Sequence, residues 1–389
     1  MMAHRLAFRK SRSGFVLLMS LGAVVFFSLA IVAVLVRGVW QSQASTRLYN
    51  RSSALQLADA AVDQAARNLT TSDSSDDITS ATLAAGSFQI DSAVEVSTTI
   101  YRVTAHGTSG SEQRRVEAIF RLTPQSVFQF ALFGSQNVNV SGNAVTDSYD
   151  SASGSYDEDT AGHHGDVGTN STSVGGVTVG GNIFVDGQVM VGPNVADPES
   201  VVTGYDPAFI TGGTSPPSDT QDVASASQTF PMPAVTVPAG LTCNDHTVAG
   251  NTTETLSPGT YCYHNLTIQG NADLTASGEV TIYVTGELTA QGNSVVGVPD
   301  DPTQMLFLMT ATADATLEQT IQGNNTFHGA IYGPQATFTI QGNATIYGSV
   351  IAQQVDVTGN ATIHYDEALE VLTQISNSYA TTRIAWREL

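Results

Sequence analysis

The feature that most constrains this chain is an uninterrupted apolar run from Phe15 to Val36, with no charged residue between Arg12 and Arg37. A helix needs roughly 20 apolar residues to cross the hydrocarbon core of a bilayer, and this run supplies them. No proline follows as far as Leu69, and apolar residues recur there at the spacing of one helical face. The pattern predicts one long helix over residues 15–70, apolar at its start and amphipathic toward its end.

The residues that precede the apolar run carry several bases and no acid: Arg5, Arg9, Lys10 and Arg12. By the positive-inside rule this end stays in the cytoplasm, so the remainder is exported. The sequence thus predicts a single-pass inner-membrane protein whose C-terminal domain is periplasmic or extracellular. A cleaved signal peptide and a plain membrane anchor are two interpretations of the run, although a signal peptide usually has a shorter apolar core.

A third interpretation depends on Ser13, Gly14 and Phe15, because the glycine directly precedes the phenylalanine that opens the run. This arrangement resembles the leader of type IV pilins and pseudopilins, which is cut after the glycine on the cytoplasmic side. The resemblance implies that residues 1–14 form a leader and that the apolar helix stays on the mature protein. Most pilins carry glutamate at the fifth mature position, where this chain has Met19. Minor pilins of the PilX kind and the tip pseudopilin K of type II secretion depart from that glutamate too.

A second stretch, residues 54–61, is rich in alanine and resembles the end of the helix in PilX N-terminal-type proteins. Together the two resemblances imply a minor, tip-near subunit of a type IV pilus or pseudopilus. They also imply that the helix contacts other pilins and pilus assembly proteins.

The charge of the chain is strongly acidic, with 14 Lys+Arg against 35 Asp+Glu. No lysine or arginine occurs from Leu122 to Thr382. Such a surface repels polyanions, so nucleic acid and anionic lipid are excluded as partners of the exported part.

The cysteines, Cys243 and Cys262, lie on either side of a Pro-Gly turn. A disulfide is predicted, because exported chains favour disulfides and no further cysteine completes a zinc set. A metal site completed by His246 and His264 is the alternative.

Residues 71–125 follow the helix with a polar break and then strand-like runs at 87–96, 99–106 and 114–122. Their alternation of apolar and polar residues predicts a small antiparallel meander, which we expect to pack on the end of the helix.

From residue 126 onward the pair Gly-Asn recurs, in the later units at intervals of about 20 residues. Alternating apolar runs follow these pairs, which lie at Gly142-Asn143, Gly181-Asn182, Gly270-Asn271, Gly292-Asn293, Gly323-Asn324, Gly342-Asn343 and Gly359-Asn360. Glycine and asparagine tolerate the left-handed backbone of a tight corner. The repeat predicts a β-solenoid over residues 126–366, with a loop excursion at 198–238; a β-sandwich is the alternative.

Runs within residues 256–366, among them Val280–Gly286 and Phe327–Pro334, resemble the β-helical domain of many PilX-type and polymer-forming surface proteins. The resemblance covers roughly residues 126–389 and implies a right-handed parallel β-helix. Residues 367–389 are predicted to form a C-terminal cap or a strand that returns toward the meander. The predicted fold class is therefore α+β, mainly β: a long helix, a small antiparallel sheet and then the β-helix.

Candidate chemistry is sparse. A uronate lyase needs positive charge, which is missing here. An inverting hydrolase can work with carboxylates alone. Its candidates are Asp300, Asp301, Asp356, Asp366 and Glu367, which form no cluster in the sequence beyond ordinary turn and loop acids. No enzyme is therefore predicted.

Four acids on a Gly/Ser-rich loop are candidate calcium ligands: Asp147, Asp150, Asp157 and Asp159. A solvated acidic loop is the ordinary alternative. The neighbouring His163 and His164 are a further candidate, for a transition metal.

The function predicted from the sequence is a non-enzymatic minor pilin or assembly protein that presents its β-domain at the cell surface for adhesion or filament priming. Its predicted partners are the inner membrane, other pilins and an extracellular glycan or surface ligand, and calcium is the single candidate cofactor. The alternative is a membrane-anchored scaffold or carbohydrate-binding protein that is not built into a filament.

Overall fold

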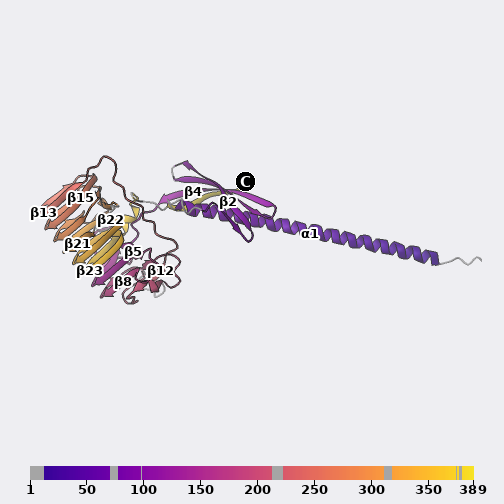
Figure 1. Cartoon of the computed structure of the whole chain (residues 1–389), viewed down its shortest axis with the longest axis horizontal. Coiled ribbons are helices and arrows are strands. Elements are labelled where there is room, and N and C mark those ends of the chain that lie inside the picture. The colour runs from indigo at the N-terminus through magenta and orange to yellow at the C-terminus, as the bar shows by residue number, and fades with distance from the viewer. Residues whose placement is uncertain are drawn as a thin grey trace, which may run out of the picture. The chain divides into compact units, whose positions relative to one another are not determined.

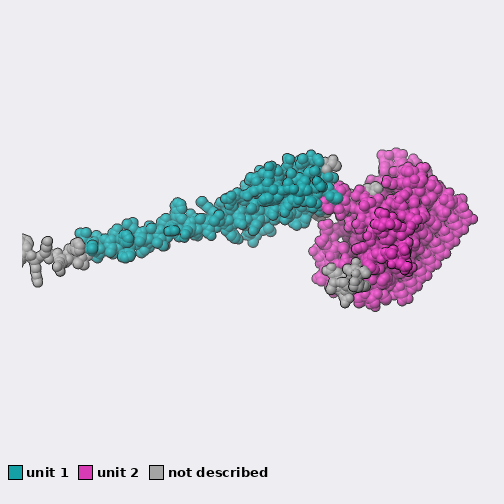
Figure 2. All heavy atoms as spheres, turned by 180° about the vertical axis from the view of Figure 1, so that it is seen from behind, with its two compact units in different colours: residues 1–123, 381–389 teal, residues 124–380 magenta. Residues whose placement is uncertain are grey.

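The computed structural model describes residues 13–70, 78–97, 99–212, 222–310, 318–373, 375 and 379–389. The chain divides into two compact units (Figure 2). The first unit comprises the residues up to Thr123 together with Thr381–Leu389, and the second comprises Pro124–Ala380.

A single α-helix, α1 (Ser13–Thr70), begins the first unit (Figure 1). From Leu17 onward it is long and apolar enough to cross a membrane, and none of its most apolar window is buried inside the protein. The N-terminal apolar helix that the sequence predicted is therefore present, and its apolar part is free to contact lipid or other helices.

The last turns of α1 pack on an antiparallel sheet. The 5-stranded sheet has the order β1-β2-β3-β4-β25. Its strands are β1 (Ser80–Leu83), β2 (Gly86–Ser97), β3 (Ile100–Ser109), β4 (Glu112–Pro124) and β25 (Tyr379–Glu388). The buried face of α1 is made largely of small residues: Ala54, Leu57, Ala58, Ala61, Val62 and Ala65. These alanines allow a strand to approach the helix closely. At Gly107 of β3, an added Cβ would collide with the backbone of Ala54 and Ala58.

The end of the chain belongs to this sheet. β25 lies beside β4, and the backbone N–H of Leu389 donates to the carbonyl of Arg115 at 2.9 Å. The ion pairs Arg114–Glu388 (2.9 Å) and Arg387–Glu117 (2.8 Å) join the two strands. Of the two alternatives for this segment, residues 379–388 take the form of the returning strand, and η5 (Glu367–Val371) precedes them.

The second unit contains a 20-stranded sheet whose strands pair in parallel. Its first strands are β5 (Leu132–Gly142), β6 (Val145–Tyr149), β7 (Val167–Thr169), β8 (Val177–Gly181), β9 (Phe184–Val185), β10 (Val189–Val191), β11 (Val202–Thr203) and β12 (Val223–Ser225). The next are β13 (Asn244–Gly250), β14 (Thr253–Leu256), β15 (Gly259–Gly270), β16 (Asp273–Ala276), β17 (Val280–Val284), β18 (Leu288–Gly292) and β19 (Val295–Val296). The last are β20 (Met305–Met309), β21 (Glu318–Gly323), β22 (Thr326–Gly342), β23 (Thr345–Gly359) and β24 (Thr362–Asp366). Three short 3-10 helices, η2 (Glu158–Thr160), η3 (Pro198–Val201) and η4 (Pro302–Gln304), lie between strands.

The solenoid predicted from the repeat, and the right-handed β-helix that the family resemblance implied, are both wrong. Six strands instead close into a parallel barrel, because β15 pairs with β17 and β18, these pair with β20 and β21, and both of those pair with β22. The path of the chain also differs from a sequential winding. The early strands β5 and β6 pair with the late strands β23 and β24 on one side and with β7, β8 and β9 on the other.

The physical reason for the error is that a local repeat specifies only local structure. The Gly-Asn pairs determine where a strand ends and which residues align with those of a neighbour. They do not determine which strand becomes that neighbour, because long-range pairing makes the choice. A segment such as β5 can therefore enter the middle of the stack.

The core of the second unit is a row of buried aliphatic and aromatic side chains that point inward from successive strands, such as Leu266, Ile282, Phe307 and Ile340. A smaller cluster lies outside the sheet, where residues 230–235 cover Phe133 and Tyr332. The hydroxyl of Tyr332 donates to the carbonyl of Pro233 at 2.7 Å. The end of the predicted excursion at 198–238 is thus packed on the sheet.

Candidate functional site

The predicted cleavage point lies at the start of α1. Gly14 and Phe15 belong to its first turn, and the side chain of Met19 is 63% exposed. Exposed apolar side chains continue as far as Val36, which is 49% exposed. The helix therefore offers an uninterrupted apolar surface. Such a surface is unfavourable in water, so lipid or other helices are expected to cover it.

The corner asparagines of the second unit form one continuous hydrogen-bonded ladder. Each Nδ2 donates to the Oδ1 of the next residue at 2.7–3.2 Å, in the order Asn182, Asn143, Asn360, Asn343, Asn324, Asn293, Asn271, Asn251. This order follows the strand pairing and not the sequence. The ladder satisfies side-chain polar groups at each corner and so reinforces the alignment of neighbouring strands.

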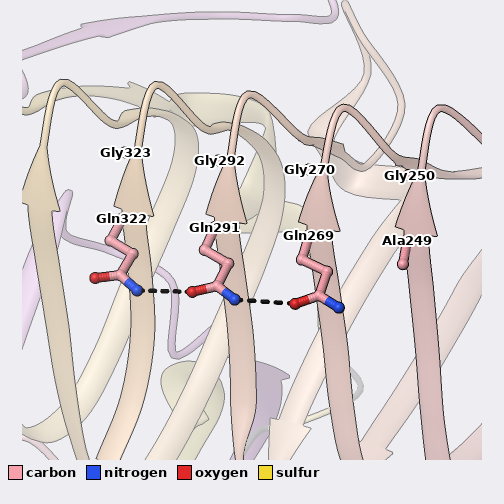
Figure 3. A pocket seen from close by; sticks show the side chains of 8 residues that line it. All are labelled: Ala249, Gly250, Gln269, Gly270, Gln291, Gly292, Gln322 and Gly323. Atoms are coloured by element: carbon pink, nitrogen blue, oxygen red, sulfur yellow. Dashed lines mark hydrogen bonds between the residues drawn. The ribbon is translucent and has the colours of Figure 1, made fainter.

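A second ladder of glutamines runs beside it (Figure 3). Nε2 of Gln322 donates to Oε1 of Gln291 at 2.9 Å, and Nε2 of Gln291 donates to Oε1 of Gln269 at 3.1 Å. Gln341 extends the ladder by donating to Gln322. Each of these glutamines directly precedes a corner glycine, and the strand register places them opposite one another. Parallel strands lie about 4.8 Å apart, so the amides recur at that step.

The glutamine ladder forms one wall of a groove of about 610 Å³, here called the ladder groove. It is lined by Ala249, Gly250, Gln269, Gly270, Gln291, Gly292, Gln322 and Gly323. Figure 3 shows the glutamine side chains lying parallel along the strands, just before the glycine corners. Because an amide has two N–H donors and two acceptor lone pairs, the ladder bonds leave part of each amide available to a ligand.

A row of histidine, tyrosine and aspartate lies elsewhere on the same stack. His328 of β22, Tyr347 of β23, His364 of β24 and Asp147 of β6 are aligned by the strand register. The His328 and Tyr347 rings stack with centroids 4.7 Å apart, and those of Tyr347 and His364 lie 4.9 Å apart. Asp147 holds the end of the row, since its carboxylate binds Nδ1 of His364 at 2.6 Å and accepts from the Tyr156 hydroxyl at 2.6 Å.

Burial favours the uncharged forms of His328 and Tyr347 in this row, since it lowers the pKa of the imidazole and raises the pKa of the phenol. The pKa of His328 is lowered to about 4, against a smaller opposing effect of Asp300, and Nδ1 of His328 has no hydrogen-bond partner among the described residues. Burial also raises the pKa of the Tyr156 hydroxyl, and its hydrogen bond to Asp147 adds to that effect. A neutral imidazole and protonated phenols are suited to stacking, which is the contact that this row makes.

The structure does not bring the predicted calcium ligands together. Asp147 is occupied by His364 and Tyr156, Asp150 accepts from the backbone of Ala152 at 3.0 Å, and Asp157 accepts from the backbone of Asp159 at 3.0 Å. Within the described ranges, no group of three or more His, Cys, Asp or Glu is placed to hold a metal ion. Likewise, His163 pairs with Asp186 at 2.8 Å, while the backbone N–H of His164 donates to the Ser148 hydroxyl.

Three of the five candidate hydrolase carboxylates line one cavity of the second unit, and the other two do not. Asp300, Asp301 and Glu367 line a cavity of about 650 Å³ together with Asp150 and Glu370. Asp356 instead accepts from Nδ2 of Asn139 on the face of the glutamine ladder. Asp366 is fully buried, and burial raises its pKa although the Ser151 hydroxyl and backbone donate to it.

The cysteines lie at one end of the stack. A disulfide joins Cys243 and Cys262, whose Cα atoms are 4.7 Å apart. Cys243 directly precedes β13, and Cys262 lies in β15, the strand with which β13 pairs. The neighbouring His246 binds Glu254 at 3.0 Å, and His264 binds the hydroxyl of Thr285 at 3.1 Å.

Comparisons with known proteins give the following. Residues 219–372 match a domain family of unknown function, DUF7305. Among solved structures, the chain is similar to the competence-associated pilin ComZ from Thermus thermophilus, with 13% identity and a TM-score of 0.25, covering 87% of this chain and 97% of that one. It is also similar to the DUF3494 domain of an ice-binding protein from Shewanella frigidimarina, with 15% identity and a TM-score of 0.29, covering 63% of this chain and 99% of that one. None of the curated proteins matches.

The sequence analysis did not predict that the glutamine ladder, or the row of histidine, tyrosine and aspartate, would form a surface of the second unit. The signal for each is a constant offset from the Gly-Asn pair. The glutamines stand one residue before the glycine, at Gln269, Gln291, Gln322 and Gln341. The second row stands four residues after the asparagine, at His328, Tyr347, His364, Asp147 and Asp186.

Proposed function

We propose that this chain is a non-enzymatic pilus or pseudopilus subunit of the minor, tip-near kind, processed between Gly14 and Phe15 and anchored in the inner membrane by α1. The observation that carries the proposal is the division of α1 into two surfaces. Its first part exposes apolar side chains from Leu17 onward, while its last turns bury Ala54 and Ala58 against the sheet. One helix thus connects a membrane-spanning surface to a folded unit without a break.

The exposed part of α1 carries small residues that let helices approach one another in a membrane: Gly22, Ala23, Ser28, Ala30 and Ala33. An added Cβ at Gly22 would meet nothing within 4 Å, so this chain leaves that surface open. Other pilin helices are the partners that such a surface suits. Met19 supplies no carboxylate for the free amine of a neighbouring subunit, which suits a subunit at the top of a filament.

Display without catalysis fits the arrangement of the second unit. Asp150 and Asp157 serve as local turn caps, and the His364–Asp147 pair is closed by Tyr156. We therefore propose that the second unit presents surfaces for adhesion or filament priming on the exported side of the membrane.

The test is the mature N-terminus. The chain is expressed with and without a prepilin peptidase, together with a pilin that the peptidase is known to process, and each N-terminus is read by mass spectrometry. We expect a chain that begins at Phe15 only when the peptidase is present, and a Gly14→Val variant that remains uncut. A chain that still begins at Met1 while the reference pilin is processed contradicts the proposal.

A second candidate function is an anchored carbohydrate-binding scaffold outside any filament, which the ladder groove favours because it is open and polar. Affinity purification from the membrane separates the two candidates. Recovery of pilin assembly proteins supports the filament subunit, and recovery of glycan alone supports the scaffold.

A further inference from the structure

We infer that the ladder groove binds a neutral, extended glycan that lies across successive strands. The inference rests on the proposed function for the export of the second unit. It specifies the class of glycan and the residues that bind it, both of which the proposed function leaves open.

The glutamine amides have hydrogen-bonding groups that the ladder itself does not use. Gln291 uses one N–H to reach Gln269 and one lone pair to accept from Gln322. One N–H donor and one lone pair therefore remain on the same amide. A sugar hydroxyl is both donor and acceptor, so it can satisfy both groups at once. The side chain of Gln291 is held in place by its neighbours, so little side-chain entropy is lost when a ligand binds.

The glycine corners permit a ligand to approach the backbone closely. Gly270, Gly292 and Gly323 have φ of 82°, 91° and 90°, which side-chain-bearing residues rarely adopt. They leave the surface beside the amides free of side chains along the groove. A flat sugar ring can therefore lie there against the backbone while its hydroxyls reach the glutamines.

The charge of the second unit disfavours anionic ligands. The chain has a net charge of −21 and no lysine or arginine from Leu122 to Thr382, so nothing in the second unit neutralises an anionic polymer. A uronate or a sulfated glycan would be repelled. An apolar ligand would leave the buried parts of the amides without partners. A peptide strand pairs at a sheet edge, whereas the ladder groove lies on the face formed by β15, β18 and β21.

The glutamine amides repeat at a regular spacing. The amides recur at the parallel strand spacing of about 4.8 Å, and an extended β-linked glycan advances by a similar step for each sugar. Each added sugar can therefore meet an identical amide. Affinity should rise with glycan length, because each further contact is intramolecular once the first has formed.

The experiment uses the full chain in detergent micelles. Calorimetry measures binding of neutral oligosaccharides of increasing length, prepared from cellulose and from chitin, and of polygalacturonate as the anionic comparison. We expect affinity to increase with length for a neutral series and no binding of polygalacturonate. The double variant Gln291→Leu/Gln322→Leu should lower the affinity at least about tenfold, since two amide contacts are lost.

The matched control is Gln335→Leu, because Gln335 is exposed and lies outside the groove; its affinity should equal that of the parent chain. Thermal unfolding of each variant checks the fold. If the leucine variant unfolds, Gln291→Glu keeps the side-chain length, removes its N–H donors and should also weaken binding. An affinity that is independent of glycan length, or unchanged in a folded ladder variant, overturns the inference. Loss of peptidase processing with glycan binding intact removes the proposed function alone.

Discussion

The two units both bury a narrow apolar face, but they differ in whether the packing contacts occur once or repeat. In the first unit, α1 meets β3 through contacts that occur once: Gly107 faces the helix backbone at Ala54 and Ala58. In the second unit similar contacts recur between several pairs of neighbouring strands, as the glutamine and asparagine ladders show. A unique contact has no substitute, whereas a repeated one has neighbours of the same kind.

This difference has an energetic consequence. In the second unit each strand pairs only with the strands beside it, so we expect damage at one strand to act mainly on its neighbours. The helix and antiparallel sheet share one small core, so damage there spreads through the unit. Hydrogen exchange resolved by segment can separate the two behaviours.

The largest effect is expected where the helix and sheet touch. Gly107→Val would force the backbone of β3 away from α1, because even a Cβ collides with Ala54 and Ala58. We expect a loss of about 3 kcal/mol in the unfolding free energy of the first unit. Hydrogen exchange should accelerate across α1, β2 and β3 together, with the second unit unchanged.

The control for this change is Gly180→Ala, since an added Cβ at Gly180 meets nothing within 4 Å. Exchange in both units should then match the parent chain. If Gly107→Val accelerates exchange only in β3 and leaves α1 protected, the first unit is not one cooperative unit and the comparison fails.

An effect of similar size but more local extent is expected at the end of the sheet that carries the disulfide. The disulfide spans a separation of 19 residues, and closing a loop of this size stabilises by about 3 kcal/mol in the chain-entropy model. The double variant Cys243→Ala/Cys262→Ala should expose β13 and β14 to exchange while β22 and β23 stay protected. Uniform acceleration along the whole stack would show that the levels are coupled more strongly than neighbour contacts allow.

The first unit was more accessible from the sequence than the second. The helix is present where the apolar run and alanine pattern predicted it, because both signals are local and lie within one element. The exposed fraction of Leu48, however, is 68%, although Leu48 belongs to the apolar face that recurs along the helix beyond residue 36. The sheet begins to cover the helix only near Ser53 and Ala54, and the helix pattern carries no information about that limit.

In the second unit, the Gly-Asn repeat predicted strands and corners but not their order. Asn360 and Asn143 are hydrogen-bonded neighbours although they are 217 residues apart, and no local pattern relates them. The same limit applies to the site. The four acids of the loop at 147–159 are close in sequence, yet Asp147 turns to His364, which comes from a strand 217 residues away. Proximity in sequence was a poor guide to proximity in space wherever long-range strand pairing determined the neighbours.

Acid should weaken the stack through one histidine. The folded pKa of His328 is about 4, below its ordinary value of 6.5. Between these values the unfolded chain binds the extra proton, so stability falls as the pH decreases through this window. From pH 8 to pH 5 the expected loss is about 2 kcal/mol. His328→Gln should not show it.

The measurement is chemical unfolding of the second unit at both pH values, compared between the parent chain and His328→Gln. The difference between the two chains isolates the histidine, because Asp166 and Asp366 have raised pKa values and so oppose the trend equally in both. His246→Gln, at an end strand where His246 binds Glu254, is the control. Equal pH dependence in the parent chain and His328→Gln would show that the imidazole is solvated in the folded state.

The smallest effect separates the two costs of a corner residue. Gly250 and Gly292 both have positive φ, 82° and 91°, so alanine at either site carries the left-handed backbone cost of about 1–2 kcal/mol. Only Gly292 has a neighbouring level on the side of its Cβ, where the atom would lie 2.6 Å from the carbonyl oxygen of Gly270; nothing lies within 4 Å of a Cβ at Gly250. Gly292→Ala should therefore destabilise the second unit by about 1 kcal/mol more than Gly250→Ala, and accelerate exchange in β15, β18 and β21 alone. Equal losses of stability in the two variants would mean that the strands can move apart slightly without destabilising the second unit. The close spacing of the strands at the ladder groove would then result from the glycines and would not require them.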